Sequence, residues 1–359
     1  MALLERNPAP STPDERPDTH SVIVRARLLR RSRAILVTSC LAAVAFVLFV
    51  GTMMIGSFSV NPWQVVAATF GFPETPGIDY VVRDLRLPTA STALAVGLAM
   101  GLSGIIFQRL LANPLASPDF VGVSSGASFF AVGSIVVLNL QGQWVALAAL
   151  LGALTAALLV YLLAWRDGIT GYRFILIGIG VSQFFLAGTG WVLSRADVYN
   201  AREAMTWLVG SVGQAGDTEL TVLLWSLAIV LPVVLLMSRQ LATLELGDDT
   251  AKALGVRVEL MRITLLLTGV VLIALATATA GPMAFVALIA GPIASRLVGA
   301  GSSALVAAAF VGASIVLLAD LVAAHALPAQ LPTGVVTGAI GAPYLIWLLV
   351  SVNREGRGG

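Results

Sequence analysis

The residue types that most often carry out chemistry are scarce in this sequence. Among its 359 residues there is one cysteine, Cys40, one lysine, Lys252, and two histidines, His20 and His325. One cysteine cannot form a disulfide framework or a cysteine-ligated metal site, and neither histidine has the neighbours that a metal site needs. No G-x-x-x-x-G-K-[ST] motif surrounds the lysine, so a nucleotide-binding P-loop is not expected. We therefore expect no catalytic residues, no metal and no cofactor bound by this chain, and any ATP that it uses would be hydrolysed by another polypeptide.

The composition indicates where such a chain resides. Hydrophobic residues make up 58% of it, charged residues only 11%, and the mean hydropathy is +0.92, whereas soluble domains carry roughly 25% charged residues. This excludes a water-soluble enzyme and predicts an all-α, polytopic membrane protein. Ten apolar segments approach spanning length: 34–55, 88–107, 120–138, 144–165, 174–193, 220–237, 263–280, 283–294, 304–324 and 333–350. The segment 283–294 is short and is expected to be broken at Gly291-Pro292.

The basic residues predict the orientation of these spans. With ten spans and a cytoplasmic N-terminus, fifteen lysines and arginines fall on the inner side and four on the outer side, as expected for cytoplasmic loops. Both termini are then cytoplasmic. We expect residues 1–33 to form a disordered basic tail, 34–352 a single transmembrane domain and 353–359 a short second tail. A cleaved signal peptide is the alternative for the N-terminus, but no A-x-A-like site closes the first apolar run.

One acidic side chain, Asp320, falls within the ten predicted spans. Carboxylates inside a membrane are often functional. This one lies about one helical turn from the predicted outer end of its span, which favours an interfacial or helix-pairing role over a proton relay.

The longest predicted cytosolic loop, 238–262, combines glycines and acids in a helix-forming pattern. Gly247 interrupts the pattern, Asp248 or Asp249 can cap a following helix, and Gly255 can end it with a positive φ. Two short helices joined by a turn would lie along the inner membrane face, where they could receive force from a separate motor. A solvated connector is the alternative.

Two further stretches interrupt the apolar pattern. Asn113-Pro114-Leu115-Ala116-Ser117-Pro118 carries two prolines, so the backbone must bend at the bilayer edge, where it either lines a cavity or forms an ordinary turn. The stretch 204–212 is apolar but too short to span, which predicts a half-inserted or interfacial helix at the outer mouth.

Several motifs occur in a characteristic order. They are Arg86-Leu87-Pro88, AVGLAMGLSG followed by Gln108, NPLASPDFVGVSSGA at 113–127, LGDDTAKALGV at 246–256, GPMAFVALIA at 281–290, Ala319-Asp320-Leu321, and LPTGVVTGAIGAPYLIWLL at 331–349. From about residue 82 to residue 350 the sequence resembles the FecCD family of bacterial ABC-importer permeases. Members of that family move ferric siderophores, haem and vitamin B12 through a ten-helix subunit of the type II importer fold.

The resemblance implies a role for each motif. Asn113, Pro114 and Leu115 fall on the family's cytoplasmic gate, and Asp320 lies where the family commonly has an acid. The segment 246–256 falls on the coupling helices, which dock in a groove of the ATPase subunit. The residues implied in this coupling are Leu246, Gly247, Asp248, Asp249, Ala251, Ala253, Leu254, Gly255 and Val256.

Three departures from the family pattern affect the expected partners. The common R-L-P-R ends here in Thr89, an outer arginine used for docking is replaced by Ala324 beside His325, and a common Pro-His pair is Gly291-Pro292. Docking of the binding protein is therefore expected to use Arg86 and His325, or a second permease. These departures also favour a heterodimer with a non-identical permease over a homodimer.

The resemblance thus implies the membrane subunit of an importer in the bacterial plasma membrane. Its expected partners are two copies of an ABC ATPase that uses Mg-ATP, a second permease, an extracytoplasmic solute-binding protein and membrane lipid, without nucleic acid. A ferric siderophore is the favoured cargo, and haem and vitamin B12 are alternatives. A secondary transporter driven by an ion gradient is the competing class, but it would need intramembrane ion sites, for which only Asp320 and Gly291-Pro292 are candidates.

Overall fold

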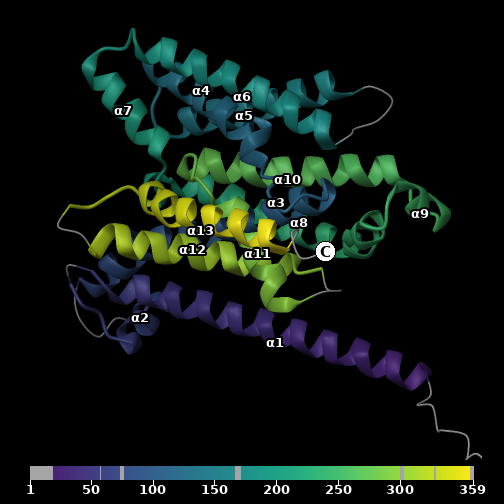
Figure 1. Cartoon of the computed structure of the whole chain (residues 1–359). Helices are drawn as coiled ribbons and strands as arrows, with labels where there is room; N and C mark the ends of the chain where they lie inside the picture. The colour runs from purple at the N-terminus through teal and green to yellow at the C-terminus, as the bar shows by residue number, and fades with distance from the viewer. Residues whose placement is uncertain are drawn as a thin grey trace, which may run out of the picture.

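A computed structural model describes residues 19–56, 58–72, 77–165, 171–299, 303–326 and 329–355, and across these ranges all regular structure is helical (Figure 1). The helices are α1 (Thr19–Met54), α2 (Pro62–Thr69), α3 (Leu87–Leu110), α4 (Val123–Val136), α5 (Gln143–Ala164), α6 (Gly171–Leu193), α7 (Val198–Val209), α8 (Asp217–Leu244), α9 (Asp248–Ala253), α10 (Val258–Ala280), α11 (Val286–Val298), α12 (Leu305–His325) and α13 (Thr333–Glu355). A π-helical segment, Tyr80–Arg86, leads into α3, and two 3-10 helices cover Pro118–Val121 and Val212–Gln214. The predicted all-α class is confirmed.

Seven of the described helices are long and apolar enough to cross a membrane, and three shorter apolar helices accompany them. In lipid a helix satisfies its own backbone hydrogen bonds, so long apolar runs fold this way. The seven lie at Arg27–Met54, Tyr80–Leu110, Gln143–Ala164, Tyr172–Leu193, Asp217–Leu244, Val258–Ala280 and Leu305–His325. The three shorter ones are Val123–Val136, Val286–Val298 and Thr333–Leu348.

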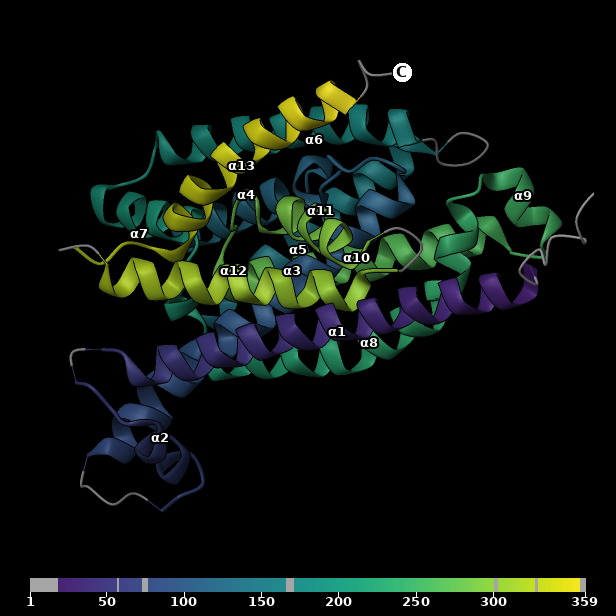
Figure 2. The same cartoon turned by 60° about the horizontal axis from the view of Figure 1, so that its bottom comes forward.

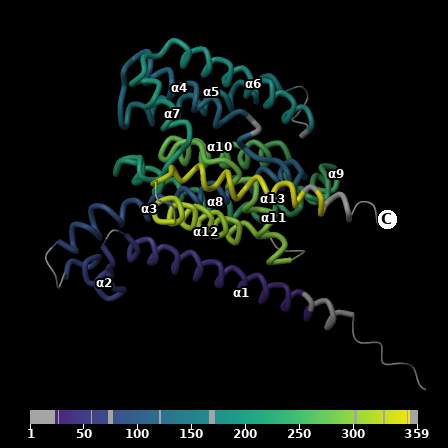
Figure 3. Tube along the Cα trace, turned by 60° about the vertical axis from the view of Figure 1, so that its left-hand side comes forward, coloured from purple at the N-terminus to yellow at the C-terminus, as the bar shows by residue number. Residues whose placement is uncertain are grey.

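Helix α3 forms the centre of the molecule. The most apolar part of its span is 83% buried, and α10, α11 and α12 pack around it. In Figures 1 and 3, α4 to α7 lie on one side of this centre and α1 on the other. The corresponding parts of α1 and α8 are only 6% and 11% buried, so their apolar side chains are available to lipid or to a partner subunit.

Small residues allow α3 to approach its neighbours closely. A Cβ atom added to Gly101 would lie 2.2 Å from the Ala308 carbonyl oxygen of α12, and one added to Gly104 would lie 1.8 Å from the Ala287 oxygen of α11. Helices in lipid gain little from burying apolar surface against each other, so such backbone contact is what holds them together. The glycine face of α3 therefore serves packing within this chain.

One expectation about the chain ends needs correction. Helix α1 begins at Thr19, so residues 19–33 are helical rather than a disordered tail, and residues 1–18 lie outside the described residues. The stretch contains neither proline nor glycine and is rich in arginine and leucine, which are good helix formers. At the other end, residues 353–355 of the expected second tail continue α13, and residues 356–359 lie outside the described part.

Helix α11 is not broken at Gly291-Pro292, contrary to expectation, and continues to Val298. A proline inside a helix leaves the carbonyl four residues earlier without its usual donor, and here that carbonyl belongs to Leu288. The Gln108 side chain of α3 donates a hydrogen bond from Nε2 to the Leu288 oxygen at 2.8 Å. The helix tolerates Pro292 because a neighbouring helix supplies the missing donor.

Candidate functional site

The predicted coupling loop folds as one short helix between two long ones. Helix α8 extends to Leu244, so the first expected short helix is the end of α8, and α9 is the second. Gly247 and Gly255 flank α9 with φ angles of +97° and +81°, which glycine adopts at little cost. Figure 2 shows α9 at the tip of a projection from the bundle. The prediction that these two glycines delimit a helix is confirmed. We call residues 247–255 the coupling knob.

The expected capping of α9 by an aspartate side chain is wrong. Gly247 occupies the N-cap position, where no side chain caps the helix. The Asp248 carboxylate instead accepts two hydrogen bonds from Arg262 Nη2 of α10, at 2.9 and 3.2 Å. Asp249 is exposed and makes no ion pair among the described residues. Asp248 therefore fastens α9 to α10.

The surface beside α9 is partly apolar. The side chains of Leu246 and Leu254, on either side of the helix, are 63% and 64% exposed. Lys252 and Asp249 are also exposed and add one charge of each sign. Ala251, by contrast, is fully buried and packs the helix onto its support. Paired exposed leucines with charged neighbours suit a protein partner better than water or lipid.

The segment after α3 bends as predicted. Ala112 has a φ of +46°, and the Asn113 backbone N–H donates to the Gln108 oxygen at 2.9 Å, which ends the helix. The Asn113 side-chain oxygen accepts a hydrogen bond from the Leu115 N–H at 2.9 Å. This Asx turn gives Asn113, Pro114 and Leu115 a defined shape, and we call residues 111–117 the bend after α3.

Sequence reasoning missed Asp119, which lies next to the predicted span 120–138 but was placed outside it. Its carboxylate accepts hydrogen bonds from Ser124 Oγ at 2.5 Å and Ser117 Oγ at 3.2 Å. The three side chains form the polar part of a cavity of about 400 Å³. Its other walls come from the end of α7, the segment between α10 and α11, α11 itself and the start of α13, through Leu208, Val209, Pro282, Met283, Ala284, Phe285, Leu288 and Gly334.

Asp119 is half-buried and lies near the level of the middle of α6 rather than at the ends of the helices. Gly122, three residues later, faces the middle of α6, where an added Cβ would lie 3.3 Å from the Ser182 nitrogen. No ion pair neutralises Asp119 among the described residues. A serine on each side of an acid, in a segment that leads into an apolar helix, is the signal that could have indicated this cluster.

A short helix, α7, is present where one was predicted, and it begins earlier than expected. Asp197 starts it by accepting hydrogen bonds from the backbone N–H groups of Tyr199 and Asn200 at 2.9 and 3.0 Å. Figure 1 shows α7 and α9 near opposite ends of the helices. Helix α7 therefore lies at the end remote from the coupling loop.

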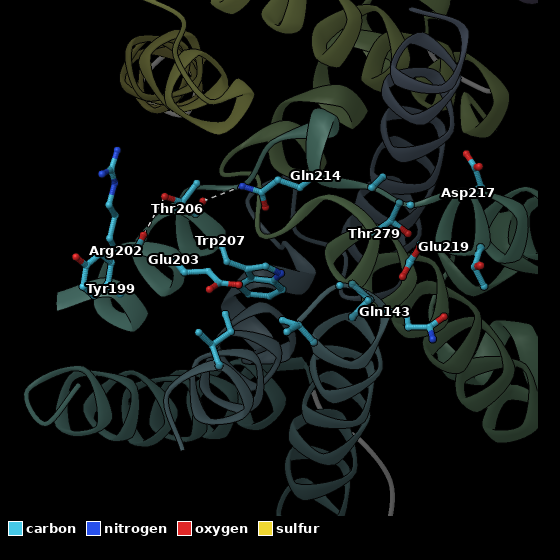
Figure 4. Close-up of a pocket in the computed structure, with 18 residues that line it drawn as sticks. Gln143, Tyr199, Arg202, Glu203, Thr206, Trp207, Gln214, Asp217, Glu219 and Thr279 are labelled. Carbon is cyan, nitrogen blue, oxygen red and sulfur yellow. Dashed lines mark hydrogen bonds between the residues drawn. The ribbon is translucent and has the colours of Figure 1, made fainter. Parts of the chain in front are cut away.

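A polar pocket of about 770 Å³ opens beside α7 (Figure 4). Helix α7 contributes Tyr199, Arg202, Glu203 and Thr206, and Gln214 Nε2 donates to the Thr206 oxygen at 3.3 Å. The starts of α5 and α8 and the end of α10 supply the opposite wall. Donors, acceptors and both signs of charge are thus available to a polar partner at this end.

The Arg86 guanidinium donates hydrogen bonds within this chain. Its Nη1 donates to the carbonyl oxygens of Met53 and Met54 at 2.8 and 3.2 Å, and its Nη2 donates to that of Phe58. An arginine capping the last carbonyls of a helix stabilises that helix end, so Arg86 holds the end of α1 and the connection to α2. Its expected contact with a binding protein stays a prediction.

The remaining predicted residues lie at the junction of α12 and α13. Asp320 accepts a hydrogen bond from Thr333 Oγ1 at 3.0 Å, which joins these two helices. This geometry agrees with a helix-pairing role. His325, at the end of α12, is exposed and its Nδ1 lies 3.2 Å from the Leu321 carbonyl oxygen.

Comparisons with known proteins agree with this architecture. The FecCD transport family model matches residues 42–351. The chain is 40% identical over 305 residues to the achromobactin transport system permease protein CbrC of Dickeya dadantii, covering 84% of this chain and 87% of CbrC. It is 40% identical over 328 residues to the ferric enterobactin transport system permease protein FepG of Escherichia coli, covering 90% and 98%.

A solved structure shares the fold. It is described as an inward-facing conformation of a metal-chelate type ABC transporter, and it superimposes with a TM-score of 0.76 at 27% identity, covering 88% of this chain and 99% of that one. The family match and the relatives extend over most of the sequence, including the bend after α3, α9 and the α12–α13 junction. The chain belongs to the FecCD transport family.

Proposed function

We propose that this chain is the permease subunit of an ATP-driven importer that carries a ferric siderophore across the bacterial plasma membrane. It is a membrane transport protein rather than an enzyme, because it belongs to a transport family. The observation that carries the cargo assignment is the 40% identity, over 84% and 90% of the chain, to permeases named for achromobactin and ferric enterobactin. Haem and vitamin B12 are the alternative cargoes.

The proposed assembly contains more than this chain. The seven long apolar helices and three shorter ones are taken to form ten spans, with both termini in the cytoplasm. A second, non-identical permease completes the path, and two ATPase subunits bind on the α9 side. A solute-binding protein docks at the α7 end, where the polar pocket of about 770 Å³ offers donors and acceptors of both charge signs.

Helix α9 is the proposed contact for the ATPase. Its exposed Leu246 and Leu254 would enter an apolar groove of that subunit, while the Asp248–Arg262 ion pair keeps α9 fixed to α10. ATP-driven closure of the two ATPase subunits would then move α9 together with the ends of α8 and α10. The coupling residues predicted between Leu246 and Val256 act here as one rigid unit.

The bend after α3 is the proposed cytoplasmic gate, and the cavity at Asp119 is a proposed part of the solute path. The cavity combines an apolar wall with one carboxylate and two hydroxyl groups. Such a lining can contact the ligand shell of a chelate through hydrogen bonds from its amide or hydroxyl groups. Few charges line it, so the solute would not be held too tightly to leave.

Uptake of radiolabelled iron by cells tests the proposed function. Iron is presented as the organism's own siderophore, as haem and as free citrate chelate, to cells with and without this gene. The proposal predicts that deletion abolishes siderophore-dependent uptake and that the gene restores it, with haem uptake unchanged. Normal siderophore uptake without the gene would contradict the cargo assignment, and loss of haem uptake alone would favour the haem alternative.

A further inference from the structure

Two consecutive side chains at the end of α3 reach in different directions. Gln108 donates to the Leu288 oxygen of α11, as described above. Arg109 forms an ion pair with Glu245, with 2.9 Å between Nη1 and Oε1. Glu245 is the residue that follows the end of α8. The end of α3 is therefore attached to α11 on one side and to α8 on the other.

This ion pair joins two segments that the sequence holds far apart. Glu245 lies two residues before Gly247, where the coupling knob begins, and Arg109 lies four residues before Asn113, in the bend after α3. Only a few backbone bonds separate each charged residue from the segment that it would influence. A displacement at the end of α8 would thus act directly on the end of α3, next to the bend.

A second connection runs parallel to the first. The Asp248–Arg262 ion pair fixes α9 to α10, and α10 is packed tightly on α3. Ser103 Oγ donates to the Gly269 oxygen at 2.7 Å, and a Cβ atom added to Gly269 would lie 2.8 Å from the Phe107 ring. Helices α3 and α10 are therefore closely packed, which connects α9 to α3 through α10, and the Arg109–Glu245 pair adds a direct side-chain contact between the ends of α3 and α8.

The surroundings of the Arg109–Glu245 pair make it stronger than an ordinary surface contact. The Arg109 side chain is 15% exposed and that of Glu245 is 40% exposed. By comparison, Arg83 and Asp79 lie 3.7 Å apart with 46% and 42% exposure. Exposed pairs are screened and contribute little, whereas a partly buried pair with a direct hydrogen bond resists separation.

We propose that the Arg109–Glu245 ion pair transmits the movement of the coupling knob around α9 to the bend after α3, so that both residues position the gate without touching the solute. This inference rests on the proposed function, because it assumes that α9 contacts an ATPase and that the bend is the gate. A chain of ion pairs and packed helices between two elements is the kind of connection through which such coupling can pass.

The test measures the gate directly in the assembled transporter. The reference chain carries Cys40→Ser, which removes its one native cysteine, and Leu115→Cys as a reporter in the bend. Labelling of the reporter by a membrane-impermeant maleimide is timed with and without Mg-ATP, and ATP hydrolysis is measured on the same samples. Variants are Arg109→Glu, Glu245→Arg, the double exchange, and Arg109→Lys.

The proposal predicts a reciprocal pattern. Arg109→Glu and Glu245→Arg, the two single charge reversals, each reduce the effect of nucleotide on labelling by about fivefold, which is in the range expected for contacting residues. The rate of ATP hydrolysis stays within about twofold of that of the reference chain. The double exchange and Arg109→Lys recover most of the effect. Arg239→Glu is the matched control, because Arg239 is exposed on α8 and pairs with no acid among the described residues.

Three results would overturn the inference. They are full nucleotide-dependent labelling in the single reversals, no recovery in the double exchange, and no effect of nucleotide in the reference chain. Uptake of ferric siderophore is measured separately with the wild-type chain, in which the gate residue Leu115 is intact. Absence of that uptake with intact nucleotide-dependent labelling would contradict the cargo assignment and leave the ion-pair relay supported.

Discussion

Replacing Asp248 by asparagine separates the role of the α9–α10 ion pair from the general effect of charge on α9. Asp248 and Asp249 both lie in the first turn of α9, so both interact favourably with the helix dipole. Only Asp248 accepts hydrogen bonds from Arg262. Asp249→Asn is therefore a control that removes the same charge from the same turn without breaking the pair.

The magnitude follows from the geometry of the pair. Hydrogen bonds between charged groups are worth about 1.5–3 kcal/mol when they are buried, but Asp248 is 44% exposed and Arg262 17% exposed. Solvent screening reduces the value to about 1 kcal/mol. A difference of 1 kcal/mol corresponds to roughly a fivefold change in an equilibrium.

Binding of the ATPase subunit to the permease in lipid nanodiscs is the appropriate assay. Asp248→Asn is expected to weaken binding by about fivefold, because α9 is then less often held in its docked position, and Asp249→Asn by less than about twofold. The difference between the two variants should shrink as salt concentration rises, since the ion pair is partly screened. Equal losses for both variants at low salt would refute the assignment of Asp248 to the α9–α10 contact.

Three further predictions concern packing, a helix end and the cavity. Gly104→Ala should destabilise the chain by about 1–3 kcal/mol, because the added Cβ would overlap the Ala287 carbonyl. Thermal unfolding in detergent measures this loss. Gly133→Ala is the control and should cause a smaller change, because a Cβ added there has no atom within 4 Å. Arg86→Ala should lower the free energy of unfolding by about 1–3 kcal/mol, because the hydrogen bonds to the α1 carbonyls are lost. An unchanged free energy of unfolding, together with a salt-sensitive loss of affinity for the binding protein, would instead favour a docking role. Asp119→Leu should reduce ATP-driven siderophore uptake by about tenfold, and more than Asp119→Asn, because leucine leaves two cavity serines without their acceptor. Equal uptake by the wild-type chain and Asp119→Leu would remove this carboxylate from the solute path.

Local patterns in the sequence predicted the parts of this molecule that depend on local physics. Apolar runs of spanning length became helices, because a chain in lipid must satisfy its backbone internally. Gly247 and Gly255 delimited α9 because positive φ angles favour glycine wherever they occur. The two prolines after α3 bent the backbone for a similarly local reason.

The errors arose where a distant residue changed the local outcome. Pro292 does not break α11, because Gln108, 180 residues away from Leu288 in the sequence, donates to the freed carbonyl. Asp248 does not cap α9, because Gly247 occupies the N-cap position, and the Asp248 carboxylate accepts hydrogen bonds from the distant Arg262 instead. Both cases required knowledge of which helices are neighbours, and no single-sequence pattern contains that information.

Among the site residues, too, features set by the local sequence were predicted and features set by distant residues were not. The bend after α3 was predicted from its two prolines, and the limits of α9 were predicted from the glycines on either side of it. Asp119 was missed because its importance comes from the walls that α7, α11 and α13 place around it. The hydrogen bonds of Arg86 to carbonyls of α1, more than thirty residues earlier, could not be read from the sequence, and its contact with a binding protein stays a prediction.

The most direct test of the central claim is transport by purified components in proteoliposomes. This chain is reconstituted with its partner permease and ATPase subunit, the binding protein loaded with radiolabelled ferric siderophore is added outside, and Mg-ATP is enclosed or omitted. If this chain belongs to an ATP-driven importer, iron accumulates inside only when ATP is enclosed, and collapsing ion gradients leaves this accumulation unchanged. Accumulation driven by an ion gradient without ATP, or none in the presence of ATP, would contradict this claim.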